Sequence, residues 1–549
     1  MDWNEQLEKV GEVNMKLFTN GKIYLQRNQF AEAMLIKDNI IVKVGSNEEL
    51  INESTPDETI NLNGKTVLPG LIDSHLHFLM TAEYLSMLDI TNAPSMAELM
   101  NRVDKHIKEN KLTKEDVLYT EGWNQNQFID EKRVPNRQDI DQVAKDVPVV
   151  LIRVDRHMGS LNTAALNYFG ITKDTKLAIG GEIQQDEKGE LTGVLTEGAL
   201  DLIRHRLPEK SVTEKKDMLI ETMKKANAVG LTSVHANDAK DETIDDVLQL
   251  YQELEDEKKL TLRFYQQVWF NDGKYMPIYF ESDYAFQKGT DWNKIGPIKL
   301  FIDGSLGART AALREPYADD PGNRGILTKS EETLTNEVAQ AVANGYQVII
   351  HGIGDRGIET ILNAYDQVLD GKENSLRLGI NHMQLTDHDL IDRVAKKGYL
   401  TYVQPLFLED DLPILRARVG AERAETSYLF QTMINKNIHQ SLSSDAPVVS
   451  FNPFEAIQSA LTRNRISEPL EHAHLPKEAM DIYSAIDAHT IEGAYASFDE
   501  DKKGRIKEGY LADFIILNED IFTTPKEEIK NIEVLATYVD GKRVYQKSE

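Results

Sequence analysis

Two histidines that close an apolar run are the first residues whose types and spacing suggest chemistry. The run ends in Asp73-Ser-His-Leu-His, so one residue separates His75 from His77. Side chains at positions i and i+2 of a strand point to the same face, which places both imidazoles on one side. Neutral imidazoles are good ligands for zinc and similar divalent ions. Alone, this pair is weak evidence, because histidines fall into such spacing by chance.

Three more residues of ligand type end apolar segments farther along the chain. They are His351, His382 and Asp445, and the two histidines are separated by about the length of one βαβ unit. Any one of them alone fits a hydrogen-bonded residue of the core. Taken with the first pair, however, they give four histidines and one aspartate at the ends of strand candidates. This pattern predicts a metal site.

A lysine inside an apolar segment is the sixth candidate ligand. Lys299 lies in the run Gly296-Pro-Ile-Lys-Leu-Phe-Ile-Asp. A buried ammonium group is costly, so this lysine is expected to be paired, deprotonated or modified. Reaction with carbon dioxide would give a carbamate, whose oxygens can bridge two metal ions. The alternative is an aliphatic stem that carries the ammonium group to the surface.

These residues require strands that bring them to one place. Eight apolar runs are strand candidates, and helix-like segments such as 331–344 and 357–369 lie between them. Alternating strands and helices favour a parallel sheet, and eight strands fit a TIM barrel, whose catalytic residues lie at the carboxyl ends of the strands. The strand candidates are Val67–Ile72, Val149–Val154, Thr232–His235, Ile298–Ile302, Gln347–His351, Leu378–His382, Leu400–Gln404 and Gln440–Ser443.

The two ends of the chain have a different texture from the middle, with short β-like runs broken by turn signals. We expect residues 1–68 and 492–549 to form one small β-sandwich domain, although two unrelated terminal ribbons are an alternative. Residues 69–491 would form the barrel, with an insertion around 91–197 where the strand candidates are farther apart. The predicted fold is α/β, a distorted TIM (β/α)8 barrel with a β-sandwich built from both termini.

Composition narrows the classes of partner. The 549 residues carry a net charge of −28, which repels phosphate backbones and disfavours nucleic acid. The chain has no cysteine, which excludes disulfides and thiolate ligands. No secretion signal is visible, and no apolar run approaches the ~18 residues of a membrane span. We therefore expect a cytoplasmic protein that acts on a small molecule without membrane contact, and we expect a homodimer.

The candidate ligands, in their order along the chain, resemble the ligand pattern of the amidohydrolase superfamily. The finer resemblance is to amidohydrolase family 3, the YtcJ-like branch, which also contains N-substituted formamide deformylase. It extends from about Lys16 to Tyr545 and implies a TIM barrel, a composite β-sandwich and one or two divalent metal ions, most commonly zinc. The motifs that carry it are Lys299-Leu-Phe-Ile-Asp-Gly-Ser-Leu-Gly-Ala-Arg-Thr-Ala-Ala-Leu, His351-Gly-Ile-Gly-Asp, Val150-Leu-Ile-Arg-Val-Asp-Arg-His-Met-Gly and Gly509-Tyr-Leu-Ala-Asp-Phe.

The resemblance also implies roles for the individual ligands. The more buried metal ion would be held by one set of ligands and the outer ion by another, with a carboxylated Lys299 as the bridge between them. The implied reaction is hydrolysis of an amide or formamide-like C–N bond through metal-activated hydroxide, with the catalytic carboxylate of Asp445 as proton acceptor. The inner set is His75, His77 and Asp445, and the outer set is His351 and His382.

Two alternative functions are open. The deaminase branches of the superfamily carry a glutamate three residues after the histidine of the fifth strand, and here that position is Gly354. A deaminase, or another cyclic-amide hydrolase, is therefore the second hypothesis. A metal-binding scaffold without catalysis is the third, and the presence of Asp445 disfavours it.

Candidate substrate contacts lie in the expected insertion and after the fourth strand candidate, where barrel loops shape specificity. Ordinary packing is the alternative for the two aromatic residues of the insertion, and a structural ion pair is the alternative for the arginine. His235, which ends Thr232-Ser-Val-His, is a candidate for orienting a ligand. The candidate contacts are His157, Trp123, Phe128, Arg309 and Tyr317.

Overall fold

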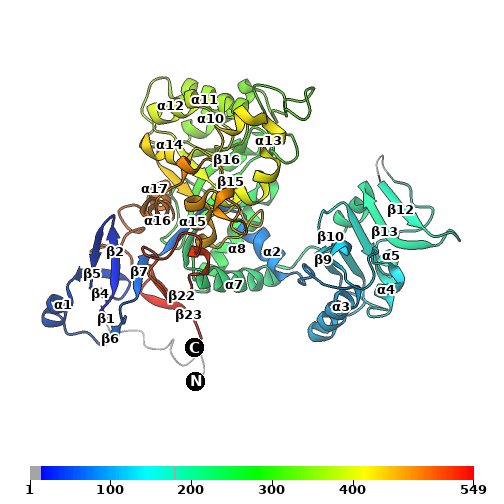
Figure 1. Ribbon diagram of the computed structural model, residues 1–549, viewed down its shortest axis with the longest axis horizontal. Coiled ribbons are helices and arrows are strands. Elements are labelled where there is room, and N and C mark those ends of the chain that lie inside the picture. Colours follow the sequence, from blue (N-terminus) through cyan, green and yellow to red (C-terminus); the bar gives the residue numbers. More distant parts are fainter. Residues whose placement is uncertain (1–13, 178–180, 272, 549) are drawn as a thin grey trace. The chain divides into compact units, whose positions relative to one another are not determined.

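A computed structural model describes residues 14–177, 181–271 and 273–548. The chain divides into two compact units (Figure 1), one formed by residues 1–81 with 219–549 and the other by residues 82–218. The first unit contains every predicted metal ligand. Among the described residues, no helix is both long enough and apolar enough to cross a bilayer.

An eight-stranded parallel sheet forms the centre of the first unit, which confirms the predicted barrel. Its last strand returns to its first, because the backbone N–H of Asp445 donates to the carbonyl of His75 at 2.8 Å. In order around the barrel, the strands are β8 (Leu71–Leu76), β14 (Leu231–Lys240), β15 (Arg263–Trp269), β16 (Asn293–Phe301), β17 (Val348–Gly352), β18 (Gly379–His382), β19 (Leu400–Val403) and β20 (Gln440–Leu442).

Helices follow the barrel strands along the chain. The helix α12 (His388–Lys397) shows the local rules: the Asp387 side chain accepts from the N–H of Leu390 as N-cap, and Gly398, with φ of 66°, ends the helix in the left-handed region. The others include α8 (Ile244–Asp256), α9 (Met276–Phe280), α10 (Glu331–Ala343), α11 (Asp355–Leu369), α13 (Leu408–Ala424), α14 (Phe430–Asn435), α15 (Pro453–Thr462), α16 (Ile482–Ala488) and α17 (Ile491–Ala496).

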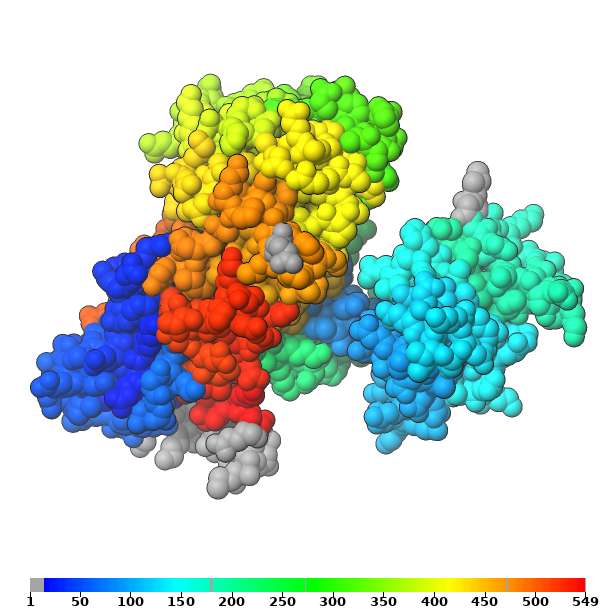
Figure 2. Space-filling view, viewed as in Figure 1, coloured from blue at the N-terminus to red at the C-terminus, as the bar shows by residue number. Residues whose placement is uncertain are grey.

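Strands from both termini build two further sheets of the first unit. A four-stranded sheet has the order β5-β4-β1-β6, and a six-stranded sheet has the order β23-β22-β21-β7-β2-β3. The N-terminal β7 and the C-terminal β21 pair antiparallel, so the blue and red ends of the chain lie side by side (Figure 2). The strands are β1 (Met15–Thr19), β2 (Lys22–Gln26), β3 (Gln29–Ala31), β4 (Ala33–Lys37), β5 (Ile40–Gly45), β6 (Glu58–Asn61), β7 (Thr66–Pro69), β21 (Phe514–Leu517), β22 (Val534–Val539) and β23 (Lys542–Gln546).

A buried apolar cluster lies between these terminal sheets. It joins N-terminal side chains such as Phe18 and Ile23 to C-terminal ones such as Phe514 and Tyr538. The rings of Phe514 and Tyr538 stack with centroids 4.5 Å apart, and Phe18 meets both edge-on. Neither end of the chain could bury these side chains by itself.

The second unit has its own five-stranded sheet, with the order β12-β13-β11-β10-β9. Alternate residues of β10 enter different apolar clusters, Val149 and Leu151 one and Val150 and Ile152 the other, so both faces of this sheet are covered. Its elements are α3 (Met96–Asn110), β9 (Leu118–Trp123), α4 (Arg137–Asp141), β10 (Val149–Arg153), β11 (Met158–Leu161), α5 (Thr163–Tyr168), β12 (Gly181–Gln185), β13 (Leu191–Glu197) and α6 (Asp201–Arg204).

Two strand predictions were wrong. Val149–Val154 was assigned to the barrel, but β10 belongs to the sheet of the second unit, and the barrel strand that takes its place is β15. The run Val67–Ile72 is two strands, because the chain passes at Gly70 from the terminal sheet into the barrel. A side chain at Gly70 would collide with Thr232, since a Cβ there would lie 2.2 Å from its hydroxyl oxygen.

Candidate metal centre

The candidate ligands lie at the carboxyl ends of the barrel strands or directly after them. The register of neighbouring strands sets His351 beside Phe301 and His382 beside Gly352, which brings successive ligands to one edge of the barrel. One ligand atom from each of His75, His382 and Asp445 lies within 4.8 Å of the other two. His382 therefore approaches the two residues that the family pattern assigns to the more buried ion.

Two imidazoles converge on one carboxylate oxygen. The Nε2 atoms of His75 and His77 lie 3.2 and 3.3 Å from Oδ1 of Asp445. All three side chains are buried or nearly buried, so little water can screen this contact. A positive charge, either a proton or a metal ion, must lie between these atoms if the imidazole lone pairs face the carboxylate.

The partners of the opposite ring nitrogens show which atom of each imidazole is free. Nδ1 of His75 lies 2.6 Å from Oε1 of Gln267, whose Nε2 donates to the carbonyl of Ser74. This donation fixes the orientation of the amide, so His75 carries its proton on Nδ1 and leaves Nε2 as the lone pair. Nδ1 of His77 is 2.9 Å from the carbonyl oxygen of Asn237, with the same consequence.

His382 and His351 are held in the same manner, but they present different atoms. Nδ1 of His382 lies 2.8 Å from Oε1 of Gln404, whose Nε2 donates to the carbonyl of Tyr402, so the lone pair of His382 is on Nε2, where it accepts from Nδ2 of Asn381 at 3.1 Å. In His351 it is Nε2 that meets a carbonyl, that of Gly304 at 3.1 Å, which leaves Nδ1 free. The geometry therefore offers three Nε2 donors and one Nδ1 donor to metal ions.

Burial keeps most of these groups in the form that binds metal. Burial lowers the pKa of His75 to about 4 and that of His351 to about 3, and it holds the pKa of His382 well below its ordinary value. For His77, burial also lowers the pKa, but its contact with Asp445 outweighs burial and raises it. Burial would raise the pKa of Asp445, yet its contacts with both histidines hold that pKa well below its ordinary value.

Lys299 lies in β16 with its side chain fully buried. Among the described residues its Nζ has no hydrogen-bond partner, and it lies 4.7 Å from the centroid of the Phe301 ring. Burial lowers the pKa of this amine to about 7. An unpaired buried amine beside a carboxylate and four imidazoles fits a metal ligand after carboxylation, and the surface-reaching stem is contradicted.

A buried aspartate supports the loop that holds His351. The Asp303 carboxylate accepts from the backbone N–H groups of Ala312, Ile353 and Gly354 at 2.8–3.1 Å. Burial raises its pKa to about 7. A Cβ at Gly354 would lie 2.0 Å from the carbonyl oxygen of Ala312, so this loop leaves no room for a side chain three residues after His351.

The second unit contains three of the predicted substrate contacts. Trp123 and Phe128 are fully buried in its hydrophobic core, and the indole N–H of Trp123 donates to the carbonyl of Leu151 at 2.9 Å. Both side chains therefore take part in ordinary core packing, which was the alternative to substrate contact. The His157 ring is exposed and lies 3.0 Å from the carboxylate of Glu197.

The two predicted contacts of the first unit are also engaged within the protein. Arg309 makes two hydrogen bonds to the Asp319 carboxylate at 2.9 and 3.0 Å, which is the structural ion pair. Tyr317 is buried, and its hydroxyl donates to the carbonyl of Ala311 at 2.9 Å. His235 lies in the middle of β14 rather than at its end, and neither of its ring nitrogens bonds a described residue.

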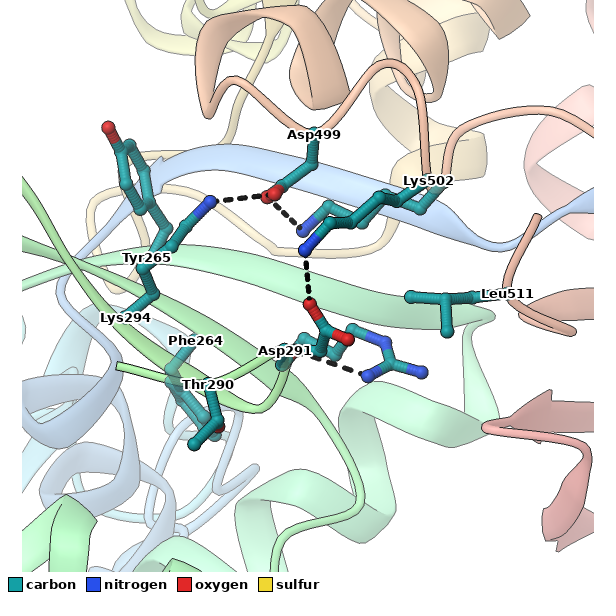
Figure 3. Close-up of a pocket in the computed structure, with 10 residues that line it drawn as sticks. Phe264, Tyr265, Thr290, Asp291, Lys294, Asp499, Lys502 and Leu511 are labelled. Carbon is teal, nitrogen blue, oxygen red and sulfur yellow. Dashed lines mark hydrogen bonds and ion pairs between the residues drawn. The ribbon is translucent and has the colours of Figure 1, made fainter. Parts of the chain in front are cut away.

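A second charged cluster lies at the opposite, amino-terminal ends of the barrel strands (Figure 3). Asp499 accepts from Lys294 at 2.7 Å and pairs with Lys503 at 3.2 Å, and Lys502 pairs with Asp291 at 2.7 Å. The hollow between these side chains holds only about 10 Å³, enough for one water molecule. Its charges are paired within the protein, so we assign this cluster to structure.

Comparison with known proteins identifies the family. The profile of the amidohydrolase family matches residues 58–545. The putative amidohydrolase YtcJ of Bacillus subtilis is 32% identical over 97% of this chain and 99% of its own. The N-substituted formamide deformylase of Arthrobacter pascens is 27% identical over 95% of this chain and 96% of its own.

A solved structure supports the same assignment. An uncharacterized metal-dependent hydrolase from Pyrococcus furiosus superimposes with a TM-score of 0.75 and 27% identity, covering 93% of this chain and 100% of that one. The cluster of candidate metal ligands, the family profile and this structural neighbour all indicate a metal-dependent hydrolase. The chain belongs to the amidohydrolase family, in its YtcJ-like family 3 branch, and the class of protein that this membership indicates is a metal-dependent amidohydrolase.

Proposed function

We propose that this protein hydrolyses an amide or formamide-like C–N bond of a small molecule at the metal centre between β8, β16, β17, β18 and β20. The observation that carries this proposal is the convergence of His75 and His77 on Asp445, with free ring nitrogens already selected by their hydrogen-bond partners. A relative with 27% identity is named for deformylation of N-substituted formamides, which supports this class of substrate.

We propose that His75, His77, His351, His382 and Asp445 bind one or two divalent ions, zinc first among them, with Lys299 as a carbamate bridge. Its buried, unpartnered Nζ supports that role. Carboxylation joins the amine nitrogen to the carbon of carbon dioxide and releases one proton. When bound, such an ion acidifies water and polarises a carbonyl group.

Asp445 is the group that moves the proton. Its carboxylate is ionised in the folded protein and lies against both histidines, so it can accept a proton from the attacking water. The water oxygen joins the carbonyl carbon, the C–N bond breaks, and Asp445 returns the proton to the leaving nitrogen. The products are a carboxylic acid, or formic acid, and an amine.

The position of Gly354 supports hydrolysis over deamination. The proton-transferring glutamate of the deaminase branches would stand there, and the backbone of Ala312 leaves no space for it. Product analysis separates the two reactions, because amide hydrolysis releases an acid and an amine, whereas deamination releases ammonia.

The test is metal content of protein prepared without chelator, measured with activity on a panel of formamides and amides. We expect one or two equivalents of metal in the wild type and loss of metal and activity in His75→Ala. In Lys299→Ala, metal should fall from two equivalents to one. His106→Ala, on α3 of the second unit, is the matched control and should keep both. Wild-type protein with no tightly bound metal would contradict the proposal.

A further inference from the structure

A buried carboxamide beside the metal ligands has no hydrogen-bond partner among the residues that the structure describes. The side chain of Asn237, in the second half of β14, is only 1% exposed, and neither its Oδ1 nor its Nδ2 bonds a described residue. Its backbone carbonyl is the group that orients His77. Buried amide groups without partners are costly, so this carboxamide points to a bound molecule that completes its hydrogen bonds.

The neighbouring residues show that Asn237 faces the mouth of the barrel. Asp238, next in the chain, accepts from the Tyr251 hydroxyl on α8 at 2.7 Å and therefore points outward to the helix layer. The register of β14 against β15 shifts between Ala236 and Ala239, where two residues of β14 stand opposite one of β15. That opposing residue is Gln267, which points inward to His75. Asn237 thus shares the inward face.

A second unpartnered donor lies on the same side of the mouth. The indole N–H of Trp269, at the end of β15, is buried and bonds no described residue. Its ring centroid is 6.2 Å from that of His77 and 4.8 Å from that of Phe301. The rings of Trp269 and Phe301 are partly exposed, so they form an aromatic wall next to the ligands.

We infer that Asn237 and Trp269 recognise the scissile group itself, and that the substrate is a secondary amide whose nitrogen carries a hydrogen and an apolar or aromatic substituent. This inference rests on the proposed function and narrows its substrate class. Oδ1 of Asn237 requires a donor, which the substrate N–H supplies. The Trp269 N–H requires an acceptor, which the substrate carbonyl supplies. The apolar substituent lies against Trp269 and Phe301.

The arrangement predicts discrimination between secondary and tertiary amides. An N-methylated amide, or an ester, brings no hydrogen to Oδ1 of Asn237 and leaves that buried oxygen without a donor. A site built to hydrogen-bond a substrate group rejects analogues that lack it. We expect a preference of about 10- to 100-fold in kcat/KM for the secondary amide over its N-methyl counterpart.

The test compares N-phenethylformamide with N-methyl-N-phenethylformamide on metal-loaded wild type, Asn237→Leu and Trp269→Phe. In Asn237→Leu the ratio of kcat/KM should fall toward one, because no acceptor selects the N–H. In Trp269→Phe, KM for both formamides should rise, since a donor to the carbonyl is lost and the ring is kept. Metal content equal to wild type shows that the His77 contact survives in each variant.

Calorimetric binding of the two formamides provides a readout that does not need turnover. If the wild type binds the secondary amide more tightly and Asn237→Leu does not, the recognition is supported even where no cleavage occurs and the proposed hydrolysis fails. If the wild type binds and cleaves both formamides equally, or if Asn237→Leu with full metal keeps the preference, Asn237 binds water only. Absence of both binding and cleavage would overturn both proposals.

Discussion

The substitution Gln267→Leu tests how the protein prepares a histidine for metal. Gln267 holds Nδ1 of His75 at 2.6 Å, and its own Nε2 is fixed by the carbonyl of Ser74 at 3.1 Å. Leucine has nearly the same size but neither accepts nor donates a hydrogen bond. The proton of His75 is then free to move to Nε2. There it forms a hydrogen bond with the Asp445 carboxylate, whose Oδ1 lies 3.2 Å away.

The magnitude follows from that competing hydrogen bond. A bond from the imidazole to the Asp445 carboxylate is worth about 1.5–3 kcal/mol because its acceptor is charged. It must be broken before Nε2 can bind metal, so metal affinity should fall by about 10- to 150-fold. Loss of an outer partner of a metal-bound histidine usually costs about 10- to 100-fold, which agrees with this range.

The assay is competition for metal against a chromophoric chelator at pH 7.5. Gln266→Leu is the matched control, because Gln266 is the adjacent residue, points to the opposite face of β15 and donates to Asn293 at 3.0 Å. We expect Gln266→Leu to keep wild-type affinity. If Gln267→Leu binds metal as tightly as Gln266→Leu does, the Nδ1 partner does not select the ring nitrogen and the reasoning is refuted.

Three further predictions concern charged side chains. Arg263→Met leaves the buried Asp513 without the two bonds it receives at 2.6 and 2.9 Å, so the free energy of unfolding in denaturant should fall by about 3–5 kcal/mol, and a loss below about 1 kcal/mol would contradict this. Burial opposes ionisation of Asp499, but two nearby lysines outweigh burial and lower its pKa, so its charge stabilises the fold above the unfolded pKa of about 3.9. Asp499→Asn should therefore be less stable than the wild type at pH 7, with a difference that shrinks as the pH falls below about 4; a difference independent of pH would disprove this linkage. Arg309→Ala should change KM for a carboxylate-bearing substrate by less than about fivefold, because its guanidinium already pairs with Asp319; a much larger rise in KM would show that it binds the substrate.

The sequence predicts the positions of the metal-centre side chains well for a physical reason. A polar ligand that ends an apolar strand leaves a local signal, because the apolar run before it must be buried. His351, His382 and Asp445 each carry that signal, and all three lie at the same edge of the barrel. Lys299 carries it as a charged residue inside an apolar strand, and its side chain is fully buried.

The strand β15 carries the opposite pattern and was missed for that reason. Its sequence, Arg-Phe-Tyr-Gln-Gln-Val-Trp, places polar side chains inside the barrel, where Gln267 bonds His75 and the buried Arg263 pairs with Asp513. An apolar run such as Val149–Arg153 looks more like a barrel strand, because a sheet covered on both faces is apolar at every position. Composition alone does not distinguish two covered faces of a separate sheet from the outer face of a barrel.

Which nitrogen each histidine presents depends on contacts that no local pattern contains. The acceptors for His75 and His77 come from strands about 160 to 190 residues away in sequence, and only the closed barrel brings them together. All four acceptors are neutral amide or carbonyl oxygens. Three of them face Nδ1 of their histidine, whereas the carbonyl of Gly304 faces Nε2 of His351, so His351 presents Nδ1 instead. Neutral acceptors orient an imidazole without adding negative charge, so Asp445 and a carbamate on Lys299 would be the anionic groups opposite the bound cations. The barrel therefore sets the direction of each histidine, and in the proposed centre Asp445 and a carbamate on Lys299 would supply the negative charge that a divalent ion requires.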